Sequence, residues 1–225
     1  MIKKISLLVL PMLGFFHFPI LAESQVFSPK IMIESLKDSI IQNIVGDQKM
    51  KGDAAKDKAL FNQEREKNLQ SHHTLAKYID FEQLGTVSLP KKWQDKFWIS
   101  SSDKKTFLTL LQDLIEEIVY PRAKDFFEKH KLVYQKEKNS GEGGKDLFYN
   151  IEIKKKSGEI EKLHLIFRVR KKQEAWKICD IRLDKELWSE MFKNQFNHII
   201  TTKSYDVLLE KMKEKLKRVQ TGEAY

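Results

Sequence analysis

The sequence has one cysteine and only one long apolar run. Cys179 cannot form an intramolecular disulfide, so the fold must rest on its apolar core. Its position inside an apolar-patterned stretch predicts a buried packing thiol rather than a nucleophile. After the first two dozen residues, no stretch is both long and apolar enough to span a bilayer.

A catalytic constellation is also missing. His72 and His73 are adjacent, so their side chains diverge, and they lack the i, i+4 spacing of a helical zinc pair. We expect both to be surface histidines. Glu116 and Glu117 diverge for the same reason, which disfavours a paired acid/base device. The glycines at 141–144 belong to a turn and not to a phosphate loop. The sequence therefore predicts neither an enzyme nor a resident cofactor.

The apolar run lies at the start of the chain. Lys3 and Lys4 precede it, and Ala22 follows it immediately before a polar stretch. This order of basic, apolar and small residues is typical of a secretory leader. We expect residues 1–22 to be cleaved near Ala22 and residues 23–225 to form a single domain. The alternative is an uncleaved anchor, which Pro11, Gly14 and Pro19 disfavour.

The chain is basic. Loss of Lys3 and Lys4 with the leader lowers the formal charge from +9 to +7. A basic exported protein tends to approach anionic surfaces such as phospholipid headgroups, and export argues against nucleic acid as a partner. The alternative is that a lysine-rich composition alone accounts for the charge.

Helical patterns occupy both ends of the mature chain. Ser28 before Pro29 suits a helix start, and Ser204 suits another. The charged residues 56–70 predict an exposed helix after a polar loop. A further helix begins behind Ser100 and is apolar over most of its circumference, so it must be covered on several sides. Pro121 is expected to end or kink it.

Strand patterns occupy the middle of the chain. Apolar residues alternate with polar ones in four stretches, which begin near Leu132, Leu147, Leu163 and Trp176. The inward phase of the last stretch changes near Asp180, which predicts a bulge. Short connections favour an antiparallel meander. The expected fold class is α+β, with a four-stranded antiparallel meander packed against several helices. Periodicity leaves open whether the core is filled or lines a cavity.

Five segments, in order, resemble the MlaC (toluene-tolerance) family. FKNQFNHI at 192–199 is the closest stretch, and the others are KFWIS (96–100), HLIFRVRKK (164–172), WKICDI (176–181) and YDVLLEKMKEKL (205–216). The sequence departs from the family where Lys185 or Glu186 replaces a usual glycine, and in an apparent insertion at 86–95. Residues 46–70 are also more charged than the family pattern.

The resemblance implies a periplasmic phospholipid carrier with a pocket between sheet and helices. Phospholipid would be its cargo, with no cofactor. Its partners would be an inner-membrane ABC-type lipid transporter complex and an outer-membrane lipoprotein complex. The residues expected to line the pocket are Leu110, Leu114, Ile118, Tyr149, Ile151, Leu165, Phe167, Ile178, Trp188 and Phe192.

Two other classes compete with the carrier. A secreted α+β interaction module with a filled core would dock through its basic surface, and a cavity with bound lipid would decide against it. An exported enzyme is disfavoured because no activated nucleophile, metal cluster or acid/base pair is visible in the sequence.

Overall fold

The structure is a computed structural model, and it describes residues 28–46, 54–141, 143–155 and 157–223. The predicted leader and its cleavage site lie outside these residues. The helical elements are α1 (Pro29–Asn43), α2 (Ala54–Ala76), α3 (Phe81–Ser88), α4 (Lys91–Phe97), α5 (Ser101–Leu114), the π-helical η1 (Ile115–Val119), α6 (Tyr120–Lys129), α7 (Trp188–Thr202) and α8 (Tyr205–Gln220). Among the described residues, no helix is long and apolar enough to cross a bilayer.

The sheet is an antiparallel meander of five strands, in the order β1 (Lys131–Asn139), β2 (Gly144–Lys154), β3 (Ile160–Lys172), β4 (Ala175–Leu183) and β5 (Glu186–Leu187). The expectation of four strands is wrong, because the sheet also contains the short β5. Asp184 adopts a positive φ of 51°, a left-handed conformation that aspartate tolerates. The chain can therefore reverse at once, and Leu183 pairs with Glu186.

The predicted bulge in the fourth strand is present. Arg168 pairs with Asp180 and Val169 pairs with Ile178, so Cys179 is the extra residue on β4. Cys179 is buried, and its Sγ lies 3.4 Å from the carbonyl oxygen of Arg168, as expected for a packing thiol. The bulge bends β4 and increases the local twist of the sheet.

Helix starts follow the predicted caps. The hydroxyls of Ser28, Ser100 and Ser204 each accept a hydrogen bond from a backbone N–H in the first turn of α1, α5 and α8. Pro121, in contrast, does not end the long helix. It lies in the first turn of α6, directly after the π-helical turn that joins α5 to α6, so its missing N–H falls where the regular i→i−4 hydrogen-bond ladder is already interrupted.

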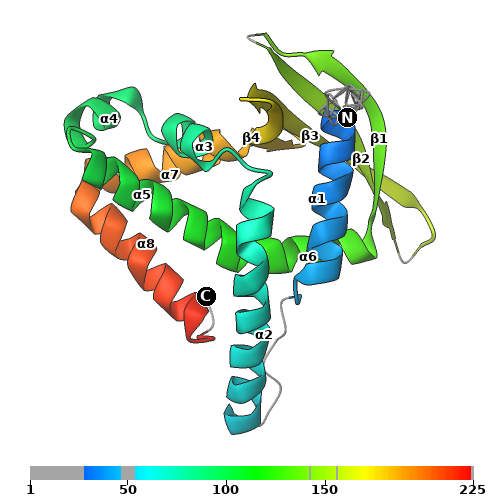
Figure 1. Cartoon of the computed structure of the whole chain (residues 1–225), viewed down its shortest axis with the longest axis horizontal. Coiled ribbons are helices and arrows are strands. Elements are labelled where there is room, and N and C mark those ends of the chain that lie inside the picture. Colours follow the sequence, from blue (N-terminus) through cyan, green and yellow to red (C-terminus); the bar gives the residue numbers. More distant parts are fainter. Residues whose placement is uncertain (1–27, 47–53, 142, 156, 224–225) are drawn as a thin grey trace, which may run out of the picture.

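Figure 1 shows α1 and α6 across one face of the sheet, while α3, α4, α5, α7 and α8 form a helical end, in which α3 and α7 also contact β4 of the sheet. The continuous segment of α5, η1 and α6, called the rod below, runs from the helical end to the sheet. Helix α2 crosses the segment and projects away from the body.

An aromatic cluster holds the helical end together. Phe107 of α5 is fully buried, and its ring centroid lies 5.6 Å from that of Trp98 and 5.5 Å from that of Phe196 on α7. Trp98 also donates a hydrogen bond of 3.2 Å from its indole N–H to the hydroxyl of Tyr205 on α8. Phe107 thus lies where three helical elements meet.

Replacement of Phe107 by alanine should lower the free energy of unfolding by about 4 kcal/mol, because it leaves a cavity among side chains that cannot close over it. Urea denaturation of the purified protein measures the change. Ile99 is 86% exposed, so Ile99→Ala is the control and should cost less than about 0.5 kcal/mol. Equal losses in the two variants would contradict this view of the core.

Candidate functional site

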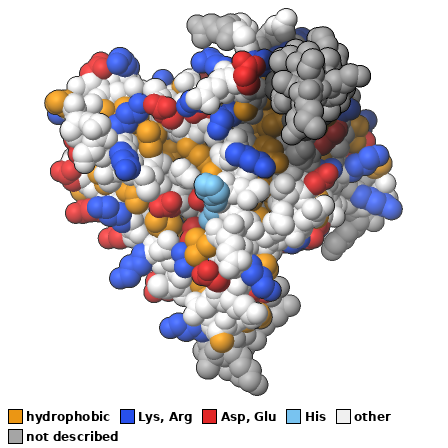
Figure 2. Space-filling model, viewed as in Figure 1, with side chains coloured by type: hydrophobic (Ala, Val, Ile, Leu, Met, Phe, Trp, Pro, Cys, Tyr) orange, Lys and Arg blue, Asp and Glu red, His pale blue; other side chains and the backbone are white. Residues whose placement is uncertain are grey.

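An apolar cavity of about 370 Å³ lies between the sheet and the helices. Its walls come from α1, η1, α6, strands β2 to β4 and the start of α7. Among the described residues that line it, Arg122 is the only charged one. Figure 2 shows hydrophobic side chains reaching the surface between the helical end and the sheet end of the molecule. A cavity of this size and composition fits an apolar ligand.

The inward faces of the strands form one wall. Alternation along β2 and β3 places Ile151, Leu165 and Phe167 on the same side of the sheet, and Ile178 of β4 joins them. The opposite wall consists of side chains from α1 and from the η1–α6 segment, namely Leu36, Ile40, Ile115, Ile118, Val119, Tyr120, Ala123, Phe126 and Phe127.

Six of the ten predicted pocket residues line this cavity, namely Ile118, Ile151, Leu165, Phe167, Ile178 and Trp188. Leu114 and Phe192 line a second groove of about 480 Å³ between α5–η1, α7 and α8. Leu110 and Tyr149 line neither space. Tyr149 is 3% exposed and is covered by the rings of Tyr134 and Phe167, at centroid distances of 5.4 and 5.6 Å.

The sequence prediction missed the contributions of α1 and α6. Leu36 and Ile40 are spaced four apart on α1, and this helical spacing was the available signal. Ala123, Phe126 and Phe127 follow Pro121, where the long helix was expected to end or kink. The π-helical turn that continues the helix past the proline leaves no signature that periodicity can detect.

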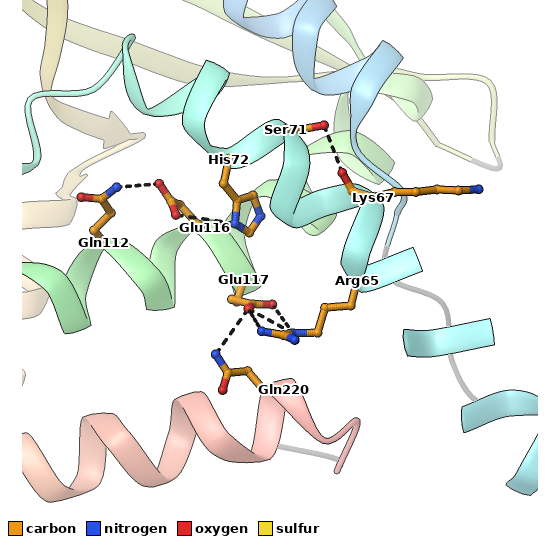
Figure 3. Close-up of polar contacts among 8 residues, drawn as sticks. All are labelled: Arg65, Lys67, Ser71, His72, Gln112, Glu116, Glu117 and Gln220. Atoms are coloured by element: carbon orange, nitrogen blue, oxygen red, sulfur yellow. Dashed lines mark hydrogen bonds and ion pairs between the residues drawn. The ribbon is translucent and has the colours of Figure 1, made fainter. Parts of the chain in front are cut away.

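A polar cluster lies against the same rod, where α2 crosses it (Figure 3). The Arg65 guanidinium donates to both oxygens of Glu117, with the Nη2–Oε1 distance at 2.6 Å. The amide of Gln220 donates to Glu117 at 3.5 Å and thereby brings in the end of α8. The Glu117 side chain is 7% exposed and that of Arg65 is 26% exposed. This ion pair joins α2 to η1.

Glu116 points away from Glu117, as adjacency predicts, and meets different partners. It accepts a hydrogen bond from Gln112 at 2.8 Å, and its Oε2 lies 3.5 Å from Nδ1 of His72. His72 is buried, so its expected place on the surface is wrong, while His73 is exposed. His72 is buried because the rod covers this face of α2, a contact that the local sequence does not reveal.

The pair of His72 and Glu116 favours its neutral forms. Burial lowers the pKa of His72, and the positive charge of Arg65 lowers it further, against an opposing contribution from Glu117. Burial also raises the pKa of the Glu116 carboxyl. Although the two side chains lie within ion-pair distance, both directions oppose charge separation, because burial disfavours each ion. We therefore treat the contact as a neutral polar contact.

The described residues offer no metal site, since no group of three or more potential ligands comes together among them. Burial raises the pKa of the Tyr120 hydroxyl at the cavity wall and that of the Cys179 thiol, which keeps both groups protonated. Neither group is activated as a nucleophile. The cavity is therefore suited to holding an apolar molecule.

Comparison with known proteins agrees with this geometry. The family model described as MlaC protein matches residues 47–214. Among solved structures, the phospholipid-binding protein from Ralstonia solanacearum in complex with a phospholipid is similar, with a TM-score of 0.62 and 16% sequence identity. The match covers 86% of this chain and 99% of that one. No curated protein sequence matches.

Replacement of Arg65 by methionine should lower the free energy of unfolding by about 3 kcal/mol, because it leaves the Glu117 carboxylate buried without its cationic partner. Chemical denaturation at neutral pH measures the effect. Lys91→Met is the control: Lys91 pairs with Asp95 four residues on, and their side chains are 79% and 60% exposed. Loss of that pair should cost less than about 0.5 kcal/mol. A similar loss of the free energy of unfolding in both variants would contradict a stabilising ion pair between α2 and η1.

His72 should make the protein less stable in acid. In the unfolded chain His72 takes up a proton near pH 6.5. In the folded protein the pKa of His72 is lowered, so the imidazole is protonated only at lower pH. The free energy of unfolding of the wild type should therefore fall relative to that of His72→Gln, by up to about 1.4 kcal/mol per pH unit below about pH 6.5.

Glu116 acts in the opposite sense, because a carboxyl with a raised pKa favours the folded state in acid and loses this contribution as the pH rises. The difference between wild type and His72→Gln therefore isolates the histidine. His73→Gln changes an exposed neighbour and should follow the wild type. A wild type that gains stability in acid relative to His72→Gln would indicate a charged pair instead.

Proposed function

The chain belongs to the MlaC family, and we propose on that basis that it is a phospholipid carrier that holds acyl tails in the cavity between sheet and helices. The observation that carries the proposal is the cavity itself, whose lining, in the part of the chain that the structure describes, has Arg122 as its one charged residue. The bound phospholipid of the Ralstonia structure, which shares the fold, supports the same choice of ligand.

Elementary energetics favour a deep apolar sleeve for this task. Each methylene removed from water contributes about 0.8 kcal/mol, so acyl chains are costly to expose during transfer between membranes. A carrier needs to cover the tails and release them, and it needs no catalytic group. We therefore infer a binding protein rather than an enzyme, with phospholipid as cargo and no cofactor.

The proposed location is the periplasm, after cleavage of residues 1–22 near Ala22. The basic, apolar and small-residue order of the leader supports this location. The proposed partners are an inner-membrane ABC-type lipid transporter complex and an outer-membrane lipoprotein complex, between which the protein would shuttle lipid. The excess of lysine and arginine over acidic residues supports approach to anionic surfaces.

The test is native mass spectrometry of the protein purified from periplasm, followed by lipid extraction. The wild type should carry discrete added masses of a diacyl phospholipid that are lost on denaturation. Ala123→Trp should reduce the bound fraction at least about tenfold, because the indole would fill space at the α6 wall.

Ala175→Trp introduces the same side chain at an exposed position of β4 and should leave lipid binding unchanged. A wild-type mass without lipid, still unchanged after incubation with phospholipid vesicles, would contradict the carrier and favour the interaction module. Equal lipid content in the two tryptophan variants would show that the ligand lies elsewhere.

A further inference from the structure

The sheet-side cavity and the groove at α8 are neighbours along one rod. Ile115, Ile118 and Val119 of η1 line both spaces. Earlier residues of the rod, including Leu114, line only the groove, and later ones, including Ala123, line only the cavity. The two spaces therefore share a wall at the π-helical turn.

Helix α7 provides the matching contact on the other side. Trp188 lines the cavity, and Phe192, one turn later, lines the groove. Their ring centroids lie 6.5 Å apart in an edge-to-face arrangement. An apolar surface thus continues from one space to the other on both η1 and α7.

The two spaces differ sharply in charge. Among the described lining residues, the sheet-side cavity has one charged side chain, that of Arg122. The groove is bordered by Lys211, Lys215 and Arg218 of α8, and Glu214 is the one acidic residue among its described lining residues. The three cations are spaced i, i+4 and i+7, so they share one face of α8. The continuous surface is therefore apolar at the sheet and predominantly cationic at α8.

We propose that the two spaces form one amphipathic binding site, in which acyl tails extend toward the sheet and an anionic phospholipid headgroup lies at Lys211 and Lys215. This assignment rests on the proposed carrier function and adds to it an orientation and a headgroup preference. A phospholipid has the same gradient from apolar tail to phosphate. A lysine near an anionic lipid surface strengthens attraction about fivefold, so two lysines suffice for a measurable preference.

The experiment measures headgroup selectivity. Purified protein is incubated with vesicles of equal phosphatidylglycerol and phosphatidylethanolamine content and matched acyl chains, and the bound lipids are extracted and quantified. The wild type should enrich phosphatidylglycerol. Lys211→Gln/Lys215→Gln should reduce this enrichment at least about tenfold while total bound lipid persists, because the apolar lining is unchanged.

Two matched variants make the test specific. Lys213→Gln/Lys217→Gln removes the same charge from exposed positions of α8 that do not line the groove, and it should retain the enrichment. Lys211→Arg/Lys215→Arg keeps the charge and should also retain it. Circular dichroism and thermal midpoints confirm that all variants are folded.

Several results would overturn the assignment. Equal phosphatidylglycerol enrichment in Lys211→Gln/Lys215→Gln and Lys213→Gln/Lys217→Gln would contradict a headgroup site at α8. A lipid-loaded wild type without phosphatidylglycerol enrichment would contradict it as well. Neither result would contradict the carrier function. A wild type that binds no lipid at all would refute the carrier function and this assignment together.

Discussion

The architecture depends on one constraint, the need to cover a helical rod that is apolar on more than one side. The segment from Ser101 to Lys129 contacts α8 and α3 near its start and α1 and β1 near its end. No single partner could bury so wide an apolar surface. The sheet, the terminal helices and α1 are arranged around the rod, and the candidate site lies where their coverage leaves space.

The π-helical turn presents acidic side chains on one side of the rod and apolar side chains on the other. Glu116 and Glu117 face α2, where Glu116 contacts His72 and Glu117 pairs with Arg65. Ile118, in contrast, borders both the cavity and the groove. A π-turn inserts one residue into the helical ladder and so changes the faces that precede and follow it. The buried ion pair on one side holds the turn in place, and the apolar wall on the other side is positioned by it. The buried ion pair and the proposed lipid site therefore share the same five residues.

Much of the fold was predictable because its signals are local. Serine caps, alternating strands and the phase change near Asp180 each involve residues close in sequence, and each appears in the structure. The short β5 escaped prediction because two residues carry no period. The continuation past Pro121 escaped because a proline normally ends a helix, whereas here a π-turn precedes it. His72 was misjudged because its cover comes from a helix more than forty residues away.

The sequence by itself determined the α+β class, the strand alternation and the family, since each follows from the identity and spacing of nearby residues. Tertiary structure alone decided which apolar side chains border a space and which fill the core. Tyr149 and Ile151 have the same phase on one strand, yet the first is covered by neighbouring rings and the second reaches the cavity. Burial depends on what lies opposite a side chain, and the partners opposite come from distant segments brought together only by folding.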